Sequence, residues 1–400
     1  EKEKIESLND LAPVVELYHH MVRAGQFDAA CNLFYDRIQN ILYFQFGAYT
    51  STIELLRALF PDGENQPPRL VKESDQAWAL NTFASAYSMN GEPRRAVPLY
   101  EMNNDINENT SNKKNLAAGL RNLADDQFKI GTLGAAERNL RRSNDLCREI
   151  EDEFWEAVGR CYIVRVYAYL GEWQKAEEEA AASLVITEKI SHFQNQGITW
   201  AYRALHALLM ARENPKSKIN NLKSAIQSAL RALELAEEDA RTDYPVERDF
   251  VRAHWLLGAS HRANGDLEKA EKHLNESPRR CRAINLVEIE ANILLENSKL
   301  LYAQGKHEKA LNYAQEALTI TERSGYVLQG ADVNLWLAEL ALEGYRFDPS
   351  TSSGQEVENK ELAKEYAQKA LQLAHCDDGP PYHYKVAYEE AQALLEKLKE

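Results

Sequence analysis

The chain has 400 residues, of which 44% are hydrophobic and 27% charged, with only 18 glycines and 12 prolines. This composition is typical of a long helical protein and is sufficient to bury a continuous core. The formal net charge of −15 argues against nucleic-acid binding and against docking on anionic membranes, because phosphate groups repel an acidic surface.

The cellular location is predicted from the cysteines and from the absence of targeting signals. No run approaches 18 consecutive apolar residues, so the sequence predicts no membrane-spanning helix. The opening residues Glu1-Lys2-Glu3-Lys4 do not resemble a signal peptide, and the missing initiator methionine indicates a fragment of a longer protein. The five scattered cysteines favour unpaired, mostly buried thiols in a reducing cytoplasm, where we expect the protein to act.

The first predicted elements in chain order are a helical pair over residues 8–44, around Gly25, and a helix over 49–60. A loop rich in proline follows at 61–68, where the prolines prevent a helix from continuing. From residue 70 onward a glycine recurs with an alanine five positions later. These recurrences are Gly91…Ala96, Gly131…Ala136, Gly171…Ala176, Gly265…Ala270 and Gly305…Ala310.

The recurring glycines are 40 residues apart within the first three copies and within the last two. A fixed period of this length predicts a solenoid, whose units pack on their neighbours and together present a curved surface to a partner. Around Gly171, apolar residues recur at threes and fours on both sides, which indicates two helices. The glycine is expected at the joint, where a residue without Cβ adopts a left-handed conformation. Ala176 and Ala180 are small because the second helix must approach its partner closely.

Further helix pairs are expected along the rest of the chain. They cover about 70–190, 193–240 with a break near Asn214-Pro215, 246–284 and 285–324, and a single helix follows over 326–345. The sequence therefore predicts four segments. These are an N-terminal helical segment with a first degenerate repeat (1–69), the superhelix (70–345), a flexible loop (346–358) and a C-terminal capping pair of helices (359–400).

The repeats resemble the tetratricopeptide repeat (TPR). Ala84, Tyr87, Gly91 and Ala96 match its small, aromatic, glycine and alanine positions, and Val164, Tyr167, Gly171 and Ala176 match less strictly. At the aromatic position, later copies have His261 and Leu301 instead. The resemblance implies an all-α, right-handed superhelical solenoid of antiparallel helix pairs, with repeats of roughly 40 residues.

The N-terminal quarter carries a second resemblance. The segments concerned are Leu17-Tyr18-His19-His20, Arg23-Ala24-Gly25, Tyr43-Phe44-Gln45-Phe46-Gly47-Ala48-Tyr49, the run from Glu54 to Gly63, and Ala96-Val97-Pro98-Leu99-Tyr100-Glu101. They are similar to the opening of the TPR region in large prokaryotic signal-transduction ATPases with numerous domains, the STAND class. In that class the array follows a nucleotide-binding module and acts as inducer sensor and autoinhibitory element. The resemblance implies an inducer (a protein, a peptide or a small ligand) and intramolecular contacts with a nucleotide-binding module outside this sequence.

Motifs for catalysis or cofactor binding are missing from the sequence. It contains neither a Gly-x-x-x-x-Gly-Lys-Ser/Thr phosphate loop nor a Gly-x-Gly-x-x-Gly fingerprint, so ATP and Mg²⁺ are expected only in a parent module. The adjacent His19 and His20 point to different helix faces. His254 and His261 share a face but occupy core positions, which favours packing over metal binding. We therefore predict that this fragment is not an enzyme and holds no metal or cofactor.

Polar residues on the first helix of each pair are the candidate binding residues, because in TPR superhelices these helices line the concave wall. The predicted groove set is Asn81, Ser85, Arg121, Asn122, Asp125, Arg165, Tyr169, Arg252, Trp255, Arg262, Asn292, Glu296 and Lys299. Several arginines in one groove would suit a carboxylate or an acidic loop. The alternative is that these arginines and lysines only solubilise a helix surface.

Two functions remain open from the sequence. The first is the inducer-sensing, autoinhibitory domain of a STAND ATPase, with the inducer bound on the concave face. The second is a stand-alone scaffold that binds peptide tails of partner proteins without a switching role.

Overall fold

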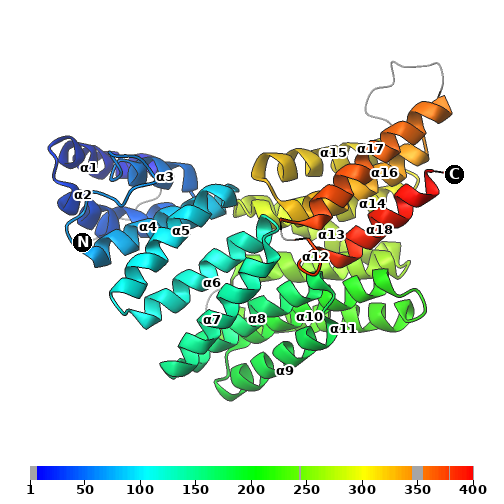
Figure 1. The fold of residues 1–400 in the computed structure, drawn as a ribbon, viewed down its shortest axis with the longest axis horizontal. Coiled ribbons are helices and arrows are strands. Elements are labelled where there is room, and N and C mark those ends of the chain that lie inside the picture. Colours follow the sequence, from blue (N-terminus) through cyan, green and yellow to red (C-terminus); the bar gives the residue numbers. More distant parts are fainter. Residues whose placement is uncertain (1–6, 243–244, 345–354, 378, 400) are drawn as a thin grey trace. The chain divides into compact units, whose positions relative to one another are not determined.

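The computed structural model describes residues 7–242, 245–344, 355–377 and 379–399. Every regular element in these residues is a helix, and successive helices pack in pairs, which confirms the predicted all-α TPR-type solenoid (Figure 1). The chain divides into two compact units, Glu1–Asp126 and Gln127–Glu400, called below the N-terminal unit and the C-terminal unit. The part described contains no helix long and apolar enough to cross a membrane.

The helices of the N-terminal unit begin with short and irregular turns. In order they are the 3-10 helix η1 (Leu8–Leu11), α1 (Ala12–Arg23), α2 (Phe27–Leu33), the π-helices η2 (Phe34–Ile38) and η3 (Ile41–Gln45), α3 (Tyr49–Arg57), α4 (Glu73–Met89), α5 (Pro93–Asn109) and α6 (Lys113–Lys129), which contains the boundary at Asp126. The helical pair predicted around Gly25 is present, but its second half continues in π-helical hydrogen bonding that the sequence did not predict.

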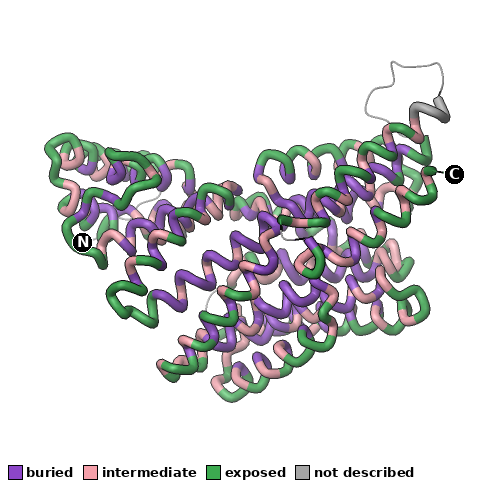
Figure 2. The backbone as a smooth tube through the Cα atoms, viewed as in Figure 1, coloured by how far each residue is buried: buried purple, intermediate pink, exposed green. Residues whose placement is uncertain are grey.

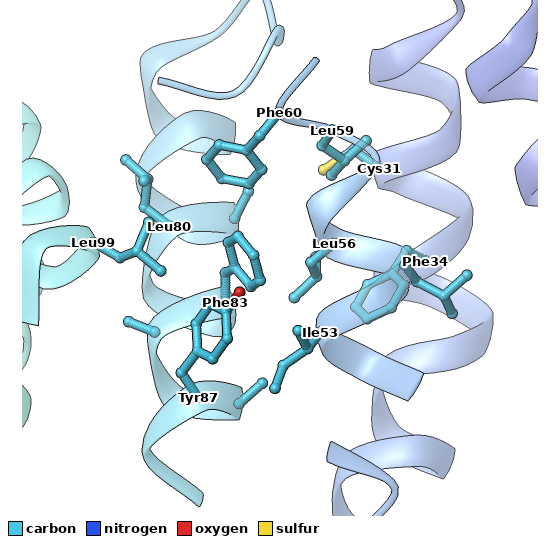
Figure 3. Close-up of a cluster of buried hydrophobic side chains, with 14 of the residues drawn as sticks. Cys31, Phe34, Ile53, Leu56, Leu59, Phe60, Leu80, Phe83, Tyr87 and Leu99 are labelled. Carbon is cyan, nitrogen blue, oxygen red and sulfur yellow. The ribbon is translucent and has the colours of Figure 1, made fainter. Parts of the chain in front are cut away.

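A single apolar cluster fills the N-terminal unit (Figure 3). Phe34 from η2, Leu56 from α3 and Phe83 from α4 are all fully buried within it. The Phe83 ring lies 5.0 Å from that of Phe60 and 4.8 Å from that of Tyr87, measured between centroids. Aromatic rings at these separations stabilise a core beyond the area that they bury.

The C-terminal unit is a run of longer helices that pack mainly on their neighbours in the chain. They are α7 (Leu133–Glu149), α8 (Glu153–Leu170), α9 (Trp173–Lys189), α10 (Phe193–Glu213), α11 (Lys218–Thr242), α12 (Glu247–Ala263), α13 (Leu267–Ala283), α14 (Val287–Ala303), α15 (His307–Ser324), α16 (Val327–Leu342), α17 (Gln355–His375) and α18 (Lys385–Lys397). Helix α17 begins inside the segment 346–358 that was predicted as a loop, and residues 346–354 of that loop lie outside the described residues.

The recurring glycines lie at the joints within the helix pairs, as predicted. Gly91, Gly131, Gly171, Gly265 and Gly305 have φ angles between 72° and 85°, the left-handed region that glycine adopts without steric cost. Gly265 and Gly305 are exposed, whereas Gly91 and Gly131 are buried, and buried residues run along the helices (Figure 2). Each glycine therefore ends one helix and lets the chain reverse into the next.

A second series of left-handed residues lies at the joints between successive pairs, where the sequence showed no glycine. Ser111, Glu151, Ser191 and Asn285 have φ angles between 51° and 57°, and Gly325 takes the equivalent position one repeat after Asn285. Ser111, Glu151 and Ser191 are again 40 residues apart. A left-handed residue thus recurs both within the helix pairs and between them. Only the turns within the pairs regularly use glycine, the residue type from which this conformation can be predicted.

An asparagine lies against a helix glycine at one crossing in each unit. A Cβ on Gly119 would overlap the Asn104 carboxamide in the N-terminal unit, and a Cβ on Gly159 would overlap the Asn144 carboxamide oxygen in the C-terminal unit. Both members of the pair recur after 40 residues. The glycine is required at these crossings because the neighbouring asparagine occupies the space of a side chain.

Candidate ligand-binding cavity

The two ends of the C-terminal unit contact each other. Helix α18 packs on α17, α16, α8 and α10, and Figure 1 shows α16, α17 and α18 side by side. Lys385 at the start of α18 forms an ion pair with Glu213 at the end of α10, and its aliphatic stem lies where a side chain on Gly171 would project. Helix α18 therefore covers part of the concave side of the C-terminal unit.

A cavity of about 610 Å³ lies inside the C-terminal unit. Its walls come from α8, α10, α11, α12, α14, α16 and α18. The polar and aromatic side chains that line it are Tyr169, Arg212, Lys218, Trp255, Arg262, Asn292, Glu296, Lys299, Tyr302, Asp332, Trp336, Glu339, Tyr384 and Glu390. A cavity of this size, with an aromatic wall and a few polar groups, is typical of ligand sites.

Part of the predicted groove set lines this cavity. These residues are Tyr169 on α8, Trp255 and Arg262 on α12, and Asn292, Glu296 and Lys299 on α14. All of them lie on first helices of their pairs. That they contact a ligand stays a prediction.

Two predicted arginines of the same unit do not line the cavity. Arg165 donates to Glu288 at 3.0 Å, and its guanidinium carbon lies 4.0 Å from the centre of the Phe128 ring. Arg252 donates to Asp249 at 2.7 Å. Both arginines are only 7% exposed, and their guanidinium groups are paired with carboxylates of the same unit. Of the arginines predicted for the groove in the C-terminal unit, Arg262 lines the cavity, whereas Arg165 and Arg252 do not.

The remaining predicted residues belong to the N-terminal unit. Asn122 donates to Asn81 at 3.2 Å, and the hydroxyls of Ser85 and Tyr100 are 2.8 Å apart. Arg121 is 7% exposed, and Asp125 is half-buried. These five residues lie outside the cavity of the C-terminal unit.

One charge cluster in the cavity joins α12 to α14. Arg262 Nε donates to the Glu296 carboxylate at 2.6 Å, and Lys299 Nζ lies 3.6 Å from the same carboxylate. Burial alone would raise the pKa of Glu296, but the positive charges of Arg262 and Lys299 lower it to about 2. Glu296 is therefore ionised and shared between two cations.

A second cluster joins α10, α16 and α18. Arg212 Nη2 lies 2.8 Å from Asp332 and 2.6 Å from Glu390, and Arg212 Nη1 donates to the Tyr384 hydroxyl at 2.8 Å. The Tyr384 hydroxyl in turn donates to Asp332 at 3.0 Å. Tyr384 is fully buried, and its ring centre lies 4.6 Å from that of Tyr169. We call Arg212, Asp332, Tyr384 and Glu390 the α18 latch, since they hold α18 in the cavity wall.

Glu339 on α16 differs from the other carboxylates of the cavity. Within the described residues it forms no ion pair and no hydrogen bond, and its side chain is exposed where it lines the cavity. Burial among the surrounding protein raises its pKa, and the Glu390 charge raises it further, against the opposing charge of Lys299. Its carboxylate is therefore without an ion-pair partner among the residues that the structure describes.

The α18 latch and Glu339 were not predicted from the sequence. Arg212 lies in the last turn of α10, which is longer than α9 and shorter than α11 and belongs to the pair predicted over 193–240. Tyr384 is 172 residues away from Arg212 in the chain. No local pattern marks such a partner, and only the closure of the unit brings the two together.

The histidines predicted to pack do so, with a third that the sequence did not indicate. His254 Nδ1 lies 3.0 Å from His273 Nδ1, and the rings of His261 and His273 stack at 5.9 Å. Burial and the neighbouring imidazoles lower the pKa of His273 to about 4, so this ring is neutral near pH 7. In the described part of the chain, no three His, Cys, Asp or Glu side chains are grouped as a metal site requires.

Comparisons with known proteins agree with this architecture. Residues 249–323, from α12 to α15, match the family model of the tetratricopeptide repeat, and no curated protein matches the chain significantly.

A Rap protein solved in complex with Competence and Sporulation Factor is similar over 98% of both chains, with 15% identity and a TM-score of 0.54. A STAND protein with a tetratricopeptide repeat sensor from Pyrococcus horikoshii is similar over 88% of this chain and 48% of that chain, with 16% identity and a TM-score of 0.43. This chain thus spans about half the length of that STAND protein. The family match within residues 249–323 and the likeness to the Rap structure show that the chain has the fold of a tetratricopeptide-type solenoid, a scaffold that presents a concave surface to partners.

Proposed function

We propose that the chain is a cytoplasmic sensor scaffold that binds a short peptide, or the end of a partner protein, in the cavity of its C-terminal unit. The observation that carries this proposal is the cavity itself, whose wall combines first helices of the repeats with α18. Its volume of about 610 Å³ suits a short stretch of chain or a comparable small molecule. Aromatic side chains such as Trp255, Tyr302 and Trp336 supply apolar contact, and the charged groups supply orientation.

The α18 latch supplies a mechanism for sensing. Because Arg212, Tyr384 and Glu390 both line the cavity and hold α18 in place, an occupant of the cavity must either use these groups or displace them. A ligand changes the state of a protein only if it binds the two states with different affinity. Reversing a 1:99 equilibrium needs roughly 5.5 kcal/mol of such difference. Breaking or forming the contacts of the α18 latch on ligand binding would contribute to this difference in binding free energy.

In the parent protein, the resemblance of the N-terminal quarter to STAND ATPases supports an autoinhibitory role. The array would contact a nucleotide-binding module and release it when the inducer binds. The ATP and Mg²⁺ would belong to that module. No cofactor is assigned to the present residues.

A stand-alone peptide-binding scaffold is the second candidate. It is supported by the Rap structure in complex with Competence and Sporulation Factor, whose whole length has the same fold as this chain. Both candidates place the occupant in the same cavity and differ only in whether a further module responds to it.

The test uses the full chain and a pool of random hexapeptides, half with a free amino terminus and half acetylated. Peptides retained at equilibrium are identified by mass spectrometry and their binding is measured by calorimetry. Ala303→Trp is the blocking variant, because Ala303 is exposed and lies in the cavity wall. Ala181→Trp on α9 is the matched control, since Ala181 is exposed and lies outside the cavity. We expect retention by the wild type and by Ala181→Trp and loss in Ala303→Trp; equal retention by all three would contradict cavity binding.

A further inference from the structure

The charged side chains that line the cavity are equal in number, but they are not all paired. The cations are Arg212, Lys218, Arg262 and Lys299, and the carboxylates are Glu296, Asp332, Glu339 and Glu390. Lys218, the first residue of α11, and Glu339 are both exposed, and no ion pair joins them among the described residues.

The pairing of these groups shows which carboxylate lacks a partner. Arg212 contacts both Asp332 and Glu390, while Arg262 and Lys299 share Glu296. All three cations are thus committed to carboxylates other than Glu339. Glu339 has no ion pair or hydrogen bond among the described residues, so its carboxylate is available to a ligand.

The surroundings of Glu339 suit a positively charged group. Trp336 lies one turn before Glu339 on α16, and its ring meets that of Tyr302 edge to face, with centroids 5.4 Å apart. The Trp336 indole is held by a hydrogen bond from Nε1 to Ser298 Oγ of 2.7 Å. Aromatic faces attract cations, and a fixed indole loses little freedom when one binds. Both rings line the same cavity as the free carboxylate.

We propose that the occupant of this cavity carries an ammonium or guanidinium group that pairs with Glu339 against the wall formed by Trp336 and Tyr302. This inference rests on the proposed function, because it names the chemistry of the ligand for the same cavity. The group supplies Glu339 with an ion-pair partner, which makes the ligand a cationic peptide end or side chain and not the carboxylate expected from a lane of arginines. A carboxylate in a partly enclosed protein wall attracts a cation more strongly than one in open solvent, because the surrounding protein has a lower dielectric constant than water.

Two sources of the cation are separated by the peptides themselves. An amino-terminal ammonium is present in the free half of the pool and absent from the acetylated half. A side-chain cation is tested by replacing each Lys with norleucine and each Arg with citrulline in the peptides that bind. A charged hydrogen bond is worth about 1.5–3 kcal/mol, so we expect the matched neutral peptide to bind roughly ten- to hundredfold more weakly.

The role of Glu339 is tested with Glu339→Gln and the control Glu343→Gln in the full chain. Glu343 is exposed, follows α16 directly and lies outside the cavity wall. We expect Glu339→Gln to abolish the preference for the charged peptide and Glu343→Gln to retain it, with far-UV spectra unchanged in both. The comparison of charged and neutral peptides on the wild type needs no variant and stands if Glu339→Gln does not fold.

The outcomes separate this inference from the proposed function. If peptides bind the wild type and are lost in Ala303→Trp, but charged and neutral versions bind equally, the inference is overturned while the proposed function stands. If the preference survives in Glu339→Gln, the cation is bound elsewhere and the assignment to Glu339 is wrong. If no peptide is retained by the wild type, the proposed function fails and the inference fails with it.

Discussion

The two units of the chain differ in what they bury. The N-terminal unit has an apolar cluster to which α3, α4 and α5 and the short helices before them contribute. In the C-terminal unit, smaller apolar clusters lie between neighbouring helices, such as that around Leu294, Leu337 and Leu340. Its inner surface instead carries ion pairs and a cavity.

This difference shows how a solenoid makes room for a ligand. Each helix pair finds its apolar core against the next pair, so the concave side does not need to be apolar for the fold to be stable. In the N-terminal unit, by contrast, side chains of α3, α4 and α5 and of the short helices before them meet in one large apolar cluster. We therefore expect substitutions in the N-terminal unit to act mainly through apolar packing and those at the cavity of the C-terminal unit mainly through ion pairing.

The largest effect is expected from Phe83→Ala in the N-terminal unit. Phe83 is fully buried between Phe60 and Tyr87. Its truncation should lower the free energy of unfolding by about 3–5 kcal/mol, because it leaves a cavity that the cluster cannot fill. Urea unfolding followed by circular dichroism measures the change. Val71→Ala is the control, since Val71 is 83% exposed, and a loss there as large as in Phe83→Ala would contradict the central role of the cluster.

Arg212→Met tests the ionic interior of the C-terminal unit. Removing this arginine leaves Asp332 and Glu390 without their cation, and we expect a loss of about 3 kcal/mol together with faster hydrogen exchange in α18. The triple variant with Asp332→Asn and Glu390→Gln should regain much of the stability, because no unpaired charge remains. Arg231→Met is the control, since Arg231 pairs with Glu234 on the surface of α11. A triple variant as unstable as Arg212→Met would show that packing, and not charge, holds α18.

Gly159→Ala tests a feature that recurs in both units. The new methyl group would overlap the Asn144 oxygen, so we expect a cost of roughly 1–3 kcal/mol by thermal unfolding. Adding Asn144→Ala should restore stability, because the methyl group then has space and alanine favours the helix. Gly119→Ala with and without Asn104→Ala is the corresponding pair in the N-terminal unit. A failure of the second substitution to rescue the first would place the strain elsewhere.

The smallest effect is a gain of at most about 0.5 kcal/mol in Glu339→Gln without ligand, because the side chain is exposed and solvent screens its charge. The folded state raises the pKa of Glu339, so its penalty is absent below the unfolded pKa near 4.5 and grows as the pH rises through the folded value. The difference between variant and wild type should therefore appear above pH 4.5 and vanish below it. Glu296→Gln should show the opposite sign, because the pKa of Glu296 is lowered to about 2 and its stabilisation is lost as the pH falls from 4.5 toward 2. Thermal unfolding across this pH range measures both, and a gain in Glu339→Gln that is independent of pH would contradict the electrostatic explanation.

The turns within the helix pairs were predictable because they use glycine, and Gly171 or Gly265 could be placed at a joint directly. The turns between pairs were not, although Ser111, Glu151 and Ser191 adopt nearly the same backbone conformation. A serine or a glutamate carries no such preference in its chemistry. Its conformation is imposed by the two helices that it connects.

For the cavity residues, too, the helix face could be predicted from the sequence, whereas the interaction partner could not. Trp255, Arg262 and Lys299 could be assigned to the inner wall from the repeat register alone, since helical periodicity decides which face a residue occupies. That Arg165 faces inward was also foreseeable, but its pairing with Glu288, 123 residues away, was not. The partner of a charge depends on how the unit closes.

Period, helix pairing and the inward faces of the helices followed from the amino-acid sequence by itself, because they depend on interactions between residues a few positions apart. The closure of the C-terminal unit, the α18 latch and the unpartnered carboxylate of Glu339 were decided only in the tertiary structure. They join α10, α14, α16 and α18, and the small curvature that each repeat adds must accumulate over the stack before these helices meet.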